Sequence, residues 1–270
     1  MFASEPGCGQ KVPPTRAAAR PGSTDAVTLI LSALPEEFEG LSRSVEAEAR
    51  RPGEADGSSL RGRMAGASVR LASTGDGAIR ATRGALSCLE DGPASFLIGA
   101  GVAGALSPAL RAGEIVVATR VADVSGDAPA PEPEWVARAV ALGAKRAAFV
   151  TVAEPLCSPA RKREVAALLG TGDAGDAAVD MESAAWARAA ASRGVPYVIL
   201  RAISDTFEEE LPGFLASCVA PDGSVDRSAV AWKLLYHPAA IPSLLALRHR
   251  ITESSAGLGR FLSRLLAREG

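Results

Sequence analysis

The stretch Val179-Asp-Met-Glu-Ser-Ala-Ala185, with the later Arg201-Ala-Ile-Ser-Asp205, decides how this chain is interpreted. Each piece places carboxylates where a predicted strand meets a helix or a loop. A small-residue helix ended by Gly194, and then the apolar run 195–200, separate the two pieces. In α/β proteins, the chemistry lies at the carboxyl ends of buried strands. The pattern therefore predicts an enzyme that holds a polyol and protonates a leaving group.

Apolar runs and helical segments alternate on both sides of these pieces. Strands are predicted at 27–34, 68–73, 95–98, 114–119, 147–152 and 195–200, and helices after Leu34, after Gly77 and over 182–193. Such alternation predicts an α/β fold with one mostly parallel or mixed sheet covered by helices. We expect a disordered leader over 1–25, a catalytic domain over 26–207 and a helical C-terminal extension over 208–270 packed on the same domain.

Composition narrows the function classes. Of the 270 residues 47% are apolar and 22% are charged, and the net charge of −2 provides no field that would attract nucleic acid. The four cysteines form no Cys-x-x-Cys pair, and the two histidines, His237 and His249, come late. No segment is typical of a signal peptide or a spanning helix. We expect a cytoplasmic protein without a metal site, whose acid–base chemistry depends on Asp and Glu.

Two groups of glycines predict tight turns where backbone amides approach a ligand, Gly75/Gly77 and Gly99/Gly101/Gly104. Neither group is a P-loop. Gly99-x-Gly-x-x-Gly104 has dinucleotide-binding spacing, but a poor helix start follows and no acidic ribose partner appears. Tight packing at a turn is an equally good interpretation of each glycine alone.

Three carboxylates have both a functional and a structural interpretation. Glu182 accepts hydrogen bonds from two sugar hydroxyls, or only complements a helix dipole. Asp205, behind Ser204, is a general acid or a turn-forming residue. Glu37, next to Glu36, activates water or only matches a helix N-terminus.

Taken together, these motifs resemble the nucleoside phosphorylase and nucleosidase superfamily, with a core like that of the methylthioadenosine nucleosidases. The resemblance covers about 27–207, in the family's order. It is carried by Ala33-Leu-Pro-Glu-Glu37, Ser73-Thr-Gly-Asp-Gly77, Gly101-Val-Ala-Gly-Ala-Leu106, Arg111-Ala-Gly-Glu-Ile-Val-Val117, Val179-Asp-Met-Glu182 and Val198-Ile-Leu-Arg-Ala-Ile-Ser-Asp205.

The resemblance implies a three-layer fold, usually in a homodimer or larger homo-oligomer, that cleaves the N-glycosidic bond of a nucleoside. By position, Asp205 would protonate or hydrogen-bond purine N7, and Glu37 would orient water. Met181 and Glu182 would hold the ribose. The base and anion sides would be lined by Gly75, Ala103 and Gly104, with Ser204 beside them.

Departures from the family pattern bear on the nucleophile. Asp180 stands for the first Glu of Glu-Met-Glu, and Val102 replaces a Ser of the glycine turn. The early Gly and the neighbouring arginines with which phosphorylases bind phosphate are missing, and Arg80 alone is near the second turn. Hydrolysis is thus favoured, with no cofactor, and phosphate as a co-substrate stays open.

After residue 207 the chain is similar to the hopanoid-associated branch of the superfamily, in 221–226, 237–245 and the long C-terminal helix. This similarity implies a purine, and above all adenine, nucleoside with a large 5′ substituent, such as an adenosyl-lipid like adenosylhopane. The alternatives are an ordinary methylthioadenosine or futalosine type nucleosidase, and a non-catalytic nucleoside-binding or membrane-associated scaffold. Retention of Glu37, Glu182 and Asp205 together argues against a scaffold.

An apolar stripe with basic flanks runs along the C-terminal segment. Its members are Leu244, Leu247, Ile251, Leu258, Phe261 or Leu262, and Leu265. Gly257 and Gly259 interrupt the stripe, so two helices are as well supported as one. The stripe either packs on the body or a partner subunit, or docks on anionic lipid at the periphery of the inner membrane.

Overall fold

The computed structural model describes residues 27–48, 59–168, 175–220 and 222–267, so the expected leader over 1–25 lies outside the described residues. Its strands are β1 (Thr28–Ser32), β2 (Glu46–Ala47), β3 (Ser59–Met64), β4 (Ala67–Ser73), β5 (Phe96–Ala105), β6 (Ile115–Asp123), β7 (Gly126–Asp127), β8 (Lys145–Thr151), β9 (Asp176–Asp180) and β10 (Tyr197–Asp205). Its α-helices are α1 (Pro35–Ser42), α2 (Ala78–Glu90), α3 (Pro133–Ala141), α4 (Pro159–Leu168), α5 (Ser183–Ser192), α6 (Arg227–Tyr236) and α7 (Ile241–Leu266), and the 3₁₀ turns η1 (Gly213–Cys218) and η2 (Pro238–Ala240) flank α6.

The strands form one mixed sheet, as the alternation of elements predicts. Its order is β10-β6-β8-β9-β5-β1-β4-β3-β2, with β7 beside β6. β1 runs parallel to β4 and β5, whereas β9 is antiparallel to β5 and β6 is antiparallel to β10. Because β10 also pairs with β5, the strands β5, β10, β6, β8 and β9 close a ring. The carboxyl ends of β1, β5, β9 and β10 lie on the wall of one cavity.

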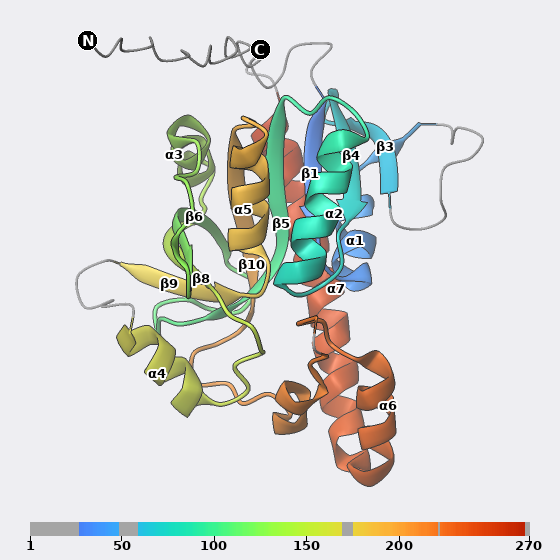
Figure 1. The fold of residues 1–270 in the computed structure, drawn as a ribbon, viewed down its shortest axis with the longest axis vertical. Coiled ribbons are helices and arrows are strands. Elements are labelled where there is room, and N and C mark those ends of the chain that lie inside the picture. The colour runs from blue at the N-terminus through green and yellow to red at the C-terminus, as the bar shows by residue number, and fades with distance from the viewer. Residues whose placement is uncertain (1–26, 49–58, 169–174, 221, 268–270) are drawn as a thin grey trace, which may run out of the picture.

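Helices cover both faces of the central strands, with α2 and α5 on one face and α1 and α7 on the other (Figure 1). Side chains alternate along a strand. Leu29 of β1 therefore joins the cluster that contains Trp186 of α5, while Ile30 joins the cluster that contains Leu258 of α7. Burial on both faces explains why the middle of β1 (29–31) and the first half of β10 (197–200) are apolar.

The predicted glycine-rich turn at 99–104 is wrong, because these residues lie inside the ten-residue strand β5. Its glycines serve close packing. A Cβ on Gly99 would lie 2.5 Å from Ile199 Cδ1, and a Cβ on Gly101 would lie 2.4 Å from both Arg201 Nη1 and Glu37 Oε1. Glycine in a strand often marks such an approach. β10 likewise continues past Leu200 to Asp205.

The C-terminal segment ends in one continuous helix, α7, which runs through Gly257 and Gly259. A Cβ on Gly259 would lie 2.7 Å from Ser44 Oγ, so this glycine allows α7 to approach the end of α1. The second half of the apolar stripe is buried against the sheet and α1, at Leu258, Phe261, Leu262 and Leu265. These residues therefore belong to the core and are not available to a lipid surface.

Among the helices that the structure describes, no single one has the length and apolar composition needed to span a membrane, although the bent pair Arg227–Leu234 with Pro238–Leu266 meets the test by length and composition.

Candidate active site

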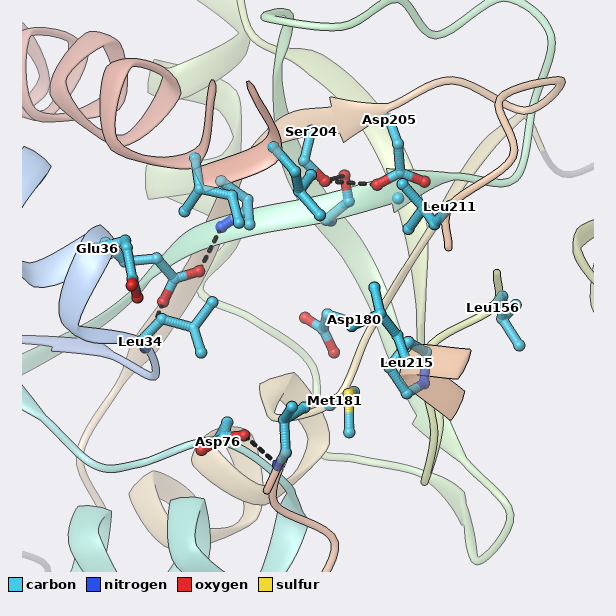
Figure 2. Close-up of a pocket in the computed structure, with 18 of the residues that line it drawn as sticks. Leu34, Glu36, Asp76, Leu156, Asp180, Met181, Ser204, Asp205, Leu211 and Leu215 are labelled. Carbon is cyan, nitrogen blue, oxygen red and sulfur yellow. Dashed lines mark hydrogen bonds between the residues drawn. The ribbon is translucent and has the colours of Figure 1, made fainter. Parts of the chain in front are cut away.

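A cavity of about 510 Å³ opens at the carboxyl ends of the central strands. Figure 2 shows Ser204 and Asp205 above the cavity, Glu36 and Leu34 on its left side, and Asp180 and Met181 toward the lower centre. The fold brings seven of the eight predicted site residues to its wall: Glu37, Ala103, Gly104, Met181, Glu182, Ser204 and Asp205. Segments far apart in the chain thus meet at one place, as predicted for strand ends of an α/β fold.

Gly75 is the predicted site residue that does not line the cavity; its neighbour Asp76 does. Gly75 has a φ of +83°, in the region that glycine adopts readily, and the atoms nearest to a Cβ there would belong to Arg80. Arg80 is half exposed and forms an ion pair with Asp222, at 2.7 Å. Neither Gly75 nor Arg80 therefore contacts the cavity directly.

Asp205 is placed by an irregularity in β10. The register with β5 shifts between Ile203 and Asp205, so that Asp205 pairs with Gly104. Such a bulge re-aims side chains, and here the neighbours Ser204 and Asp205 both line the cavity. Gly104 leaves room for the carboxylate, because a Cβ there would lie 3.0 Å from Asp205 Oδ2. Ser204 Oγ donates to Asp205 Oδ1 at 2.6 Å.

Glu182 lies at the N-cap of α5, and its Oε1 accepts a hydrogen bond from the backbone N–H of Gly77 at 3.0 Å. Burial raises the pKa of Glu182 to about 8, the negative charges of Asp180 and Glu37 act in the same direction, and Arg201 opposes them. Hydrogen bonds donated by ribose hydroxyls would favour the charged form of this carboxyl.

Glu37 is almost fully buried at the start of α1. Its Oε2 accepts from the backbone N–H groups of Ala33 and Leu34, and its Oε1 accepts from that of Val102 in β5, at 2.8 to 3.0 Å. Burial raises the pKa of Glu37, while Arg201 and these donors lower it. Glu37 thereby ties the β1–α1 junction to β5 and still lines the cavity.

Arg201 is a central residue of the site to which the sequence analysis assigned no role. It is fully buried behind the cavity, with its guanidinium 2.9 Å from Asp180, 3.6 Å from Glu182 and 3.8 Å from Glu37. The guanidinium also lies over the ring of Trp186. One cation therefore compensates three carboxylates. The sequence signal was an arginine inside the apolar run of β10, because a buried charge requires partners.

Asp180 has a supporting role in this geometry. Its Oδ1 accepts from Thr151 Oγ1 at 2.9 Å and from the backbone N–H of Ser183 at 3.1 Å, and its Oδ2 accepts from Ser183 Oγ. The same carboxylate pairs with Arg201. Asp180 therefore fixes the junction between β9 and α5, which positions Met181 and Glu182.

The C-terminal extension supplies an apolar wall to the cavity. Its contribution comprises Leu211, Leu215, Val225, Val230, Leu244, Leu247 and Ile251. Two arginines from the same segment, Arg227 and Arg248, lie at 2.9 and 3.4 Å from the carboxylate of Glu36. The first half of the predicted stripe thus faces the cavity.

A family model described as "Phosphorylase superfamily" matches residues 28–218, which include every predicted site residue. The chain belongs to the phosphorylase superfamily. The predicted membership of the nucleoside phosphorylase and nucleosidase superfamily is thereby confirmed, and with it the prediction of an enzyme of this class.

The relatives of this superfamily member include nucleosidases. A 5′-methylthioadenosine/S-adenosylhomocysteine nucleosidase of Geobacillus kaustophilus is 29% identical over 170 residues, 56% of this chain and 72% of the relative. The Campylobacter jejuni nucleosidase of the same name has a TM-score of 0.65 at 19% identity, covering 90% of this chain and 98% of its own. Futalosine hydrolase of Helicobacter pylori has a TM-score of 0.63 at 19% identity, covering 89% and 97%. These solved structures confirm the predicted fold.

Proposed function

We propose that this protein cleaves the N-glycosidic bond of a purine nucleoside, with adenine as the base and water as the nucleophile. The observation that carries the proposal is the meeting of Asp205, Glu182 and Glu37 in one cavity, from the end of β10, the junction between β9 and α5, and the start of α1. The family membership and the nucleosidase relatives support it.

The chemistry follows from how charge develops during cleavage. As the glycosidic bond breaks, the sugar becomes cation-like and the base accumulates electrons. Asp205 interacts with the base at N7, and Glu182 accepts hydrogen bonds from the ribose hydroxyls, which strengthen as the sugar gains positive charge. Met181 packs against the sugar, and Glu37 orients the attacking water.

The arrangement of cations favours water over phosphate. Among the described residues, the arginines that line the cavity are Arg227 and Arg248, and both face Glu36. Arg201 faces three carboxylates and lies behind the cavity wall. A phosphate dianion would have to displace a carboxylate from one of these arginines, so hydrolysis needs no cofactor and no rearrangement of charge.

The apolar wall from the extension suggests a large apolar 5′ substituent, including a lipid chain such as that of an adenosyl-lipid. Leu215, Leu244 and Leu247 are three of its members. The second candidate is a methylthioadenosine or futalosine type substrate, favoured by the named relatives. A cavity of about 510 Å³ falls within the ordinary range for small ligands, so its volume fits either candidate. The two substrates differ in how much of the apolar wall their 5′ substituents would contact.

Adenosine analogues with 5′ substituents of increasing apolar length test the proposal. Each analogue is incubated with the protein, with and without phosphate, and the release of free adenine, ribose and ribose 1-phosphate is measured. We expect adenine release without phosphate and a kcat/KM that rises with chain length. A maximum at the methylthio group would select the second candidate. Strict dependence on phosphate would contradict hydrolysis, and no release from any analogue would select the non-catalytic scaffold.

Glu37→Ala tests the water-orienting role directly. We expect hydrolysis to fall by roughly 10²–10⁴-fold, because the water loses its base or orienting acceptor. Glu39→Ala, on the exposed side of the same helix, is the matched control and should retain activity. Phosphate-independent adenine release at the normal rate by folded Glu37→Ala protein would exclude the role.

We further propose that the tip of the extension touches a membrane surface, peripherally and without spanning it. Large apolar side chains are exposed there, namely Trp232, Tyr236, Ile241 and Leu245. This patch, called the apolar tip below, lies on α6 and the start of α7, which protrude from the body in Figure 1. Assembly into a homo-oligomer is the alternative use of such a patch.

A further inference from the structure

Lys162 of α4 is fully buried beside the cavity, which is rare for a lysine. Its Nζ donates to Asp205 Oδ2 at 2.6 Å, to the carbonyl oxygen of Thr206 at 2.6 Å and to that of Glu209 at 3.1 Å. An ammonium group has three N–H donors, and here each has an acceptor. The cage formed by these three acceptors therefore matches the three donors of an ammonium group.

The cage determines what Asp205 presents to a ligand. A buried ammonium without a counter-charge is costly, so the pair is stable as an ammonium facing a carboxylate. The second carboxylate oxygen, Oδ1, accepts from Ser204 Oγ at 2.6 Å. With Lys162 on one oxygen and Ser204 on the other, Asp205 offers only acceptor lone pairs to the cavity.

Purines differ in what they present to such a carboxylate. A 6-aminopurine that is protonated at N7 presents two donors on one edge, the N7–H and the amino N–H. A 6-oxopurine presents the O6 acceptor on the same edge. This O6 would face the carboxylate of Asp205, also an acceptor, with no hydrogen atom between the two oxygens. Facing acceptors lose the hydrogen bond and leave both groups desolvated, which costs affinity.

We propose that Lys162 is a positioning and specificity-determining residue, which holds Asp205 as a charged acceptor and thereby selects 6-aminopurines over 6-oxopurines. The inference rests on the proposed function in one respect, that the base lies against Asp205. It assigns to α4 a part in base selection, although α4 lies at the periphery of the fold (Figure 1).

A purely structural role for Lys162 is the competing explanation. The same three contacts tie α4 to the segment 205–209, which leads into the extension. Loss of such a tie would weaken binding of every base alike. The ratio of affinities for two bases separates the explanations, because a general loosening cancels in the ratio.

Calorimetric binding of the free bases adenine and hypoxanthine to the full chain tests the proposal. For the natural protein we expect adenine to bind about 10- to 100-fold more tightly. Lys162→Met should reduce this ratio to near one, since Asp205 then loses the donor that fixes its Oδ2 and no longer holds one orientation toward the base. Lys162→Arg should retain most of the preference. Arg163→Met, at an exposed arginine of the same helix, is the matched control, because it removes a positive charge but no contact to Asp205, and should retain it too.

Asp205→Asn provides a second variant, in case Lys162→Met does not fold. Lys162 can only donate, so it orients the amide oxygen toward itself and leaves the NH₂ group facing the cavity. This variant should bind hypoxanthine more tightly than adenine, an inversion of the ratio. An unchanged preference for adenine in Lys162→Met or Asp205→Asn would overturn the proposal. Because free bases are used, failure of nucleoside cleavage would contradict only the proposed function.

Discussion

At the scale of single residues, Asp205 shows how contacts from distant segments define one carboxylate. Ser204 precedes it in the bulge of β10, Gly104 of β5 leaves it space, and Lys162 of α4 supplies its counter-charge. Its chemistry therefore depends on three separate elements.

Asp205→Asn should reduce kcat by roughly 10²–10³-fold, because the base loses the charged partner that it faces in the transition state. It should also destabilise the fold, since Lys162 is left without a counter-charge. The double variant Lys162→Met/Asp205→Asn should recover stability in urea unfolding but not activity. Recovery of both in the double variant, or near-normal turnover by the single variant, would exclude a direct role for Asp205.

Glu182 predicts a pH dependence of stability. Its pKa in the folded protein is raised from 4.5 to about 8, so between these values the folded protein holds a proton that the unfolded chain has released. The free energy of unfolding should therefore fall as pH rises through this window, by at most about 1.4 kcal/mol per pH unit. Glu182→Gln, which resembles the protonated carboxyl, should lessen the fall.

Urea unfolding at pH 5, 6.5 and 8 measures this effect, with the half-exposed Glu39→Gln as the control. The advantage of Glu182→Gln over the natural protein should grow with pH, and the control should show none. Parallel pH profiles for all three proteins would contradict a proton held at Glu182.

Glu182→Gln should also lower kcat/KM, because a neutral amide is a poorer acceptor for two ribose hydroxyls. A 2′-deoxy substrate lacks one of these hydroxyls, so the substitution should reduce its turnover less than that of the ribo substrate. Steady-state assays on both substrates decide this, and equal losses would speak against direct contact.

At the scale of elements, β5 allows other groups to approach its backbone closely. A Cβ on Gly101 would lie 2.4 Å from both Arg201 Nη1 and Glu37 Oε1. Gly101→Ala should therefore destabilise the protein by about 1–3 kcal/mol, as overpacking does. Gly257→Ala in α7 is the matched control, because its nearest neighbour would be 3.7 Å away, and it should stabilise by about 0.5–1 kcal/mol. Urea unfolding of both variants provides the measurement, and a Gly101→Ala protein as stable as the natural one would refute the packing role.

At the scale of the whole molecule, the extension has an inner face toward the cavity and an outer apolar tip. Residues 227–252 contain no Asp or Glu, and they include Arg227, Lys233, Arg248 and Arg250. An exposed aromatic pair, Trp232 and Tyr236, on such a basic segment fits an anionic lipid surface.

Flotation with anionic vesicles should recover the full chain at low salt and less of it at high salt. Trp232→Ser/Tyr236→Ser/Leu245→Ser should lose binding, whereas Val124→Ser, at an exposed apolar residue elsewhere, should retain it. Truncation after Pro242 is unsuitable as a test, because it removes core residues such as Leu258 and Phe261. The contrary result is that the natural protein fails to bind vesicles and instead forms a dimer that the triple variant disrupts. That result would assign the apolar tip to a subunit contact.

Local pattern in the sequence was enough to predict the α/β class and to single out three carboxylates that line the cavity. Strand and helix periodicity is a property of neighbouring residues, and strand ends carry the polar groups in such folds. Glu37, Glu182 and Asp205 were therefore recognisable, each at the end of an apolar run or the start of a helix. The elements missed, such as α4 and β3, have polar sequences with weak periodicity.

Only the tertiary structure decided what surrounds these carboxylates. Lys162 lies between two arginines in a polar helix, and nothing in that pattern distinguishes the buried cation from its exposed neighbours. The glycine pattern at 99–104 is compatible with a turn and with a strand. The close approach of Trp186 to Gly99 and of Arg201 to Gly101, which explains these glycines, exists only in the folded chain. Charge compensation and close packing depend on distances between residues remote in sequence, so the ion pairs around Arg201 and Asp205 appear only when the chain is folded.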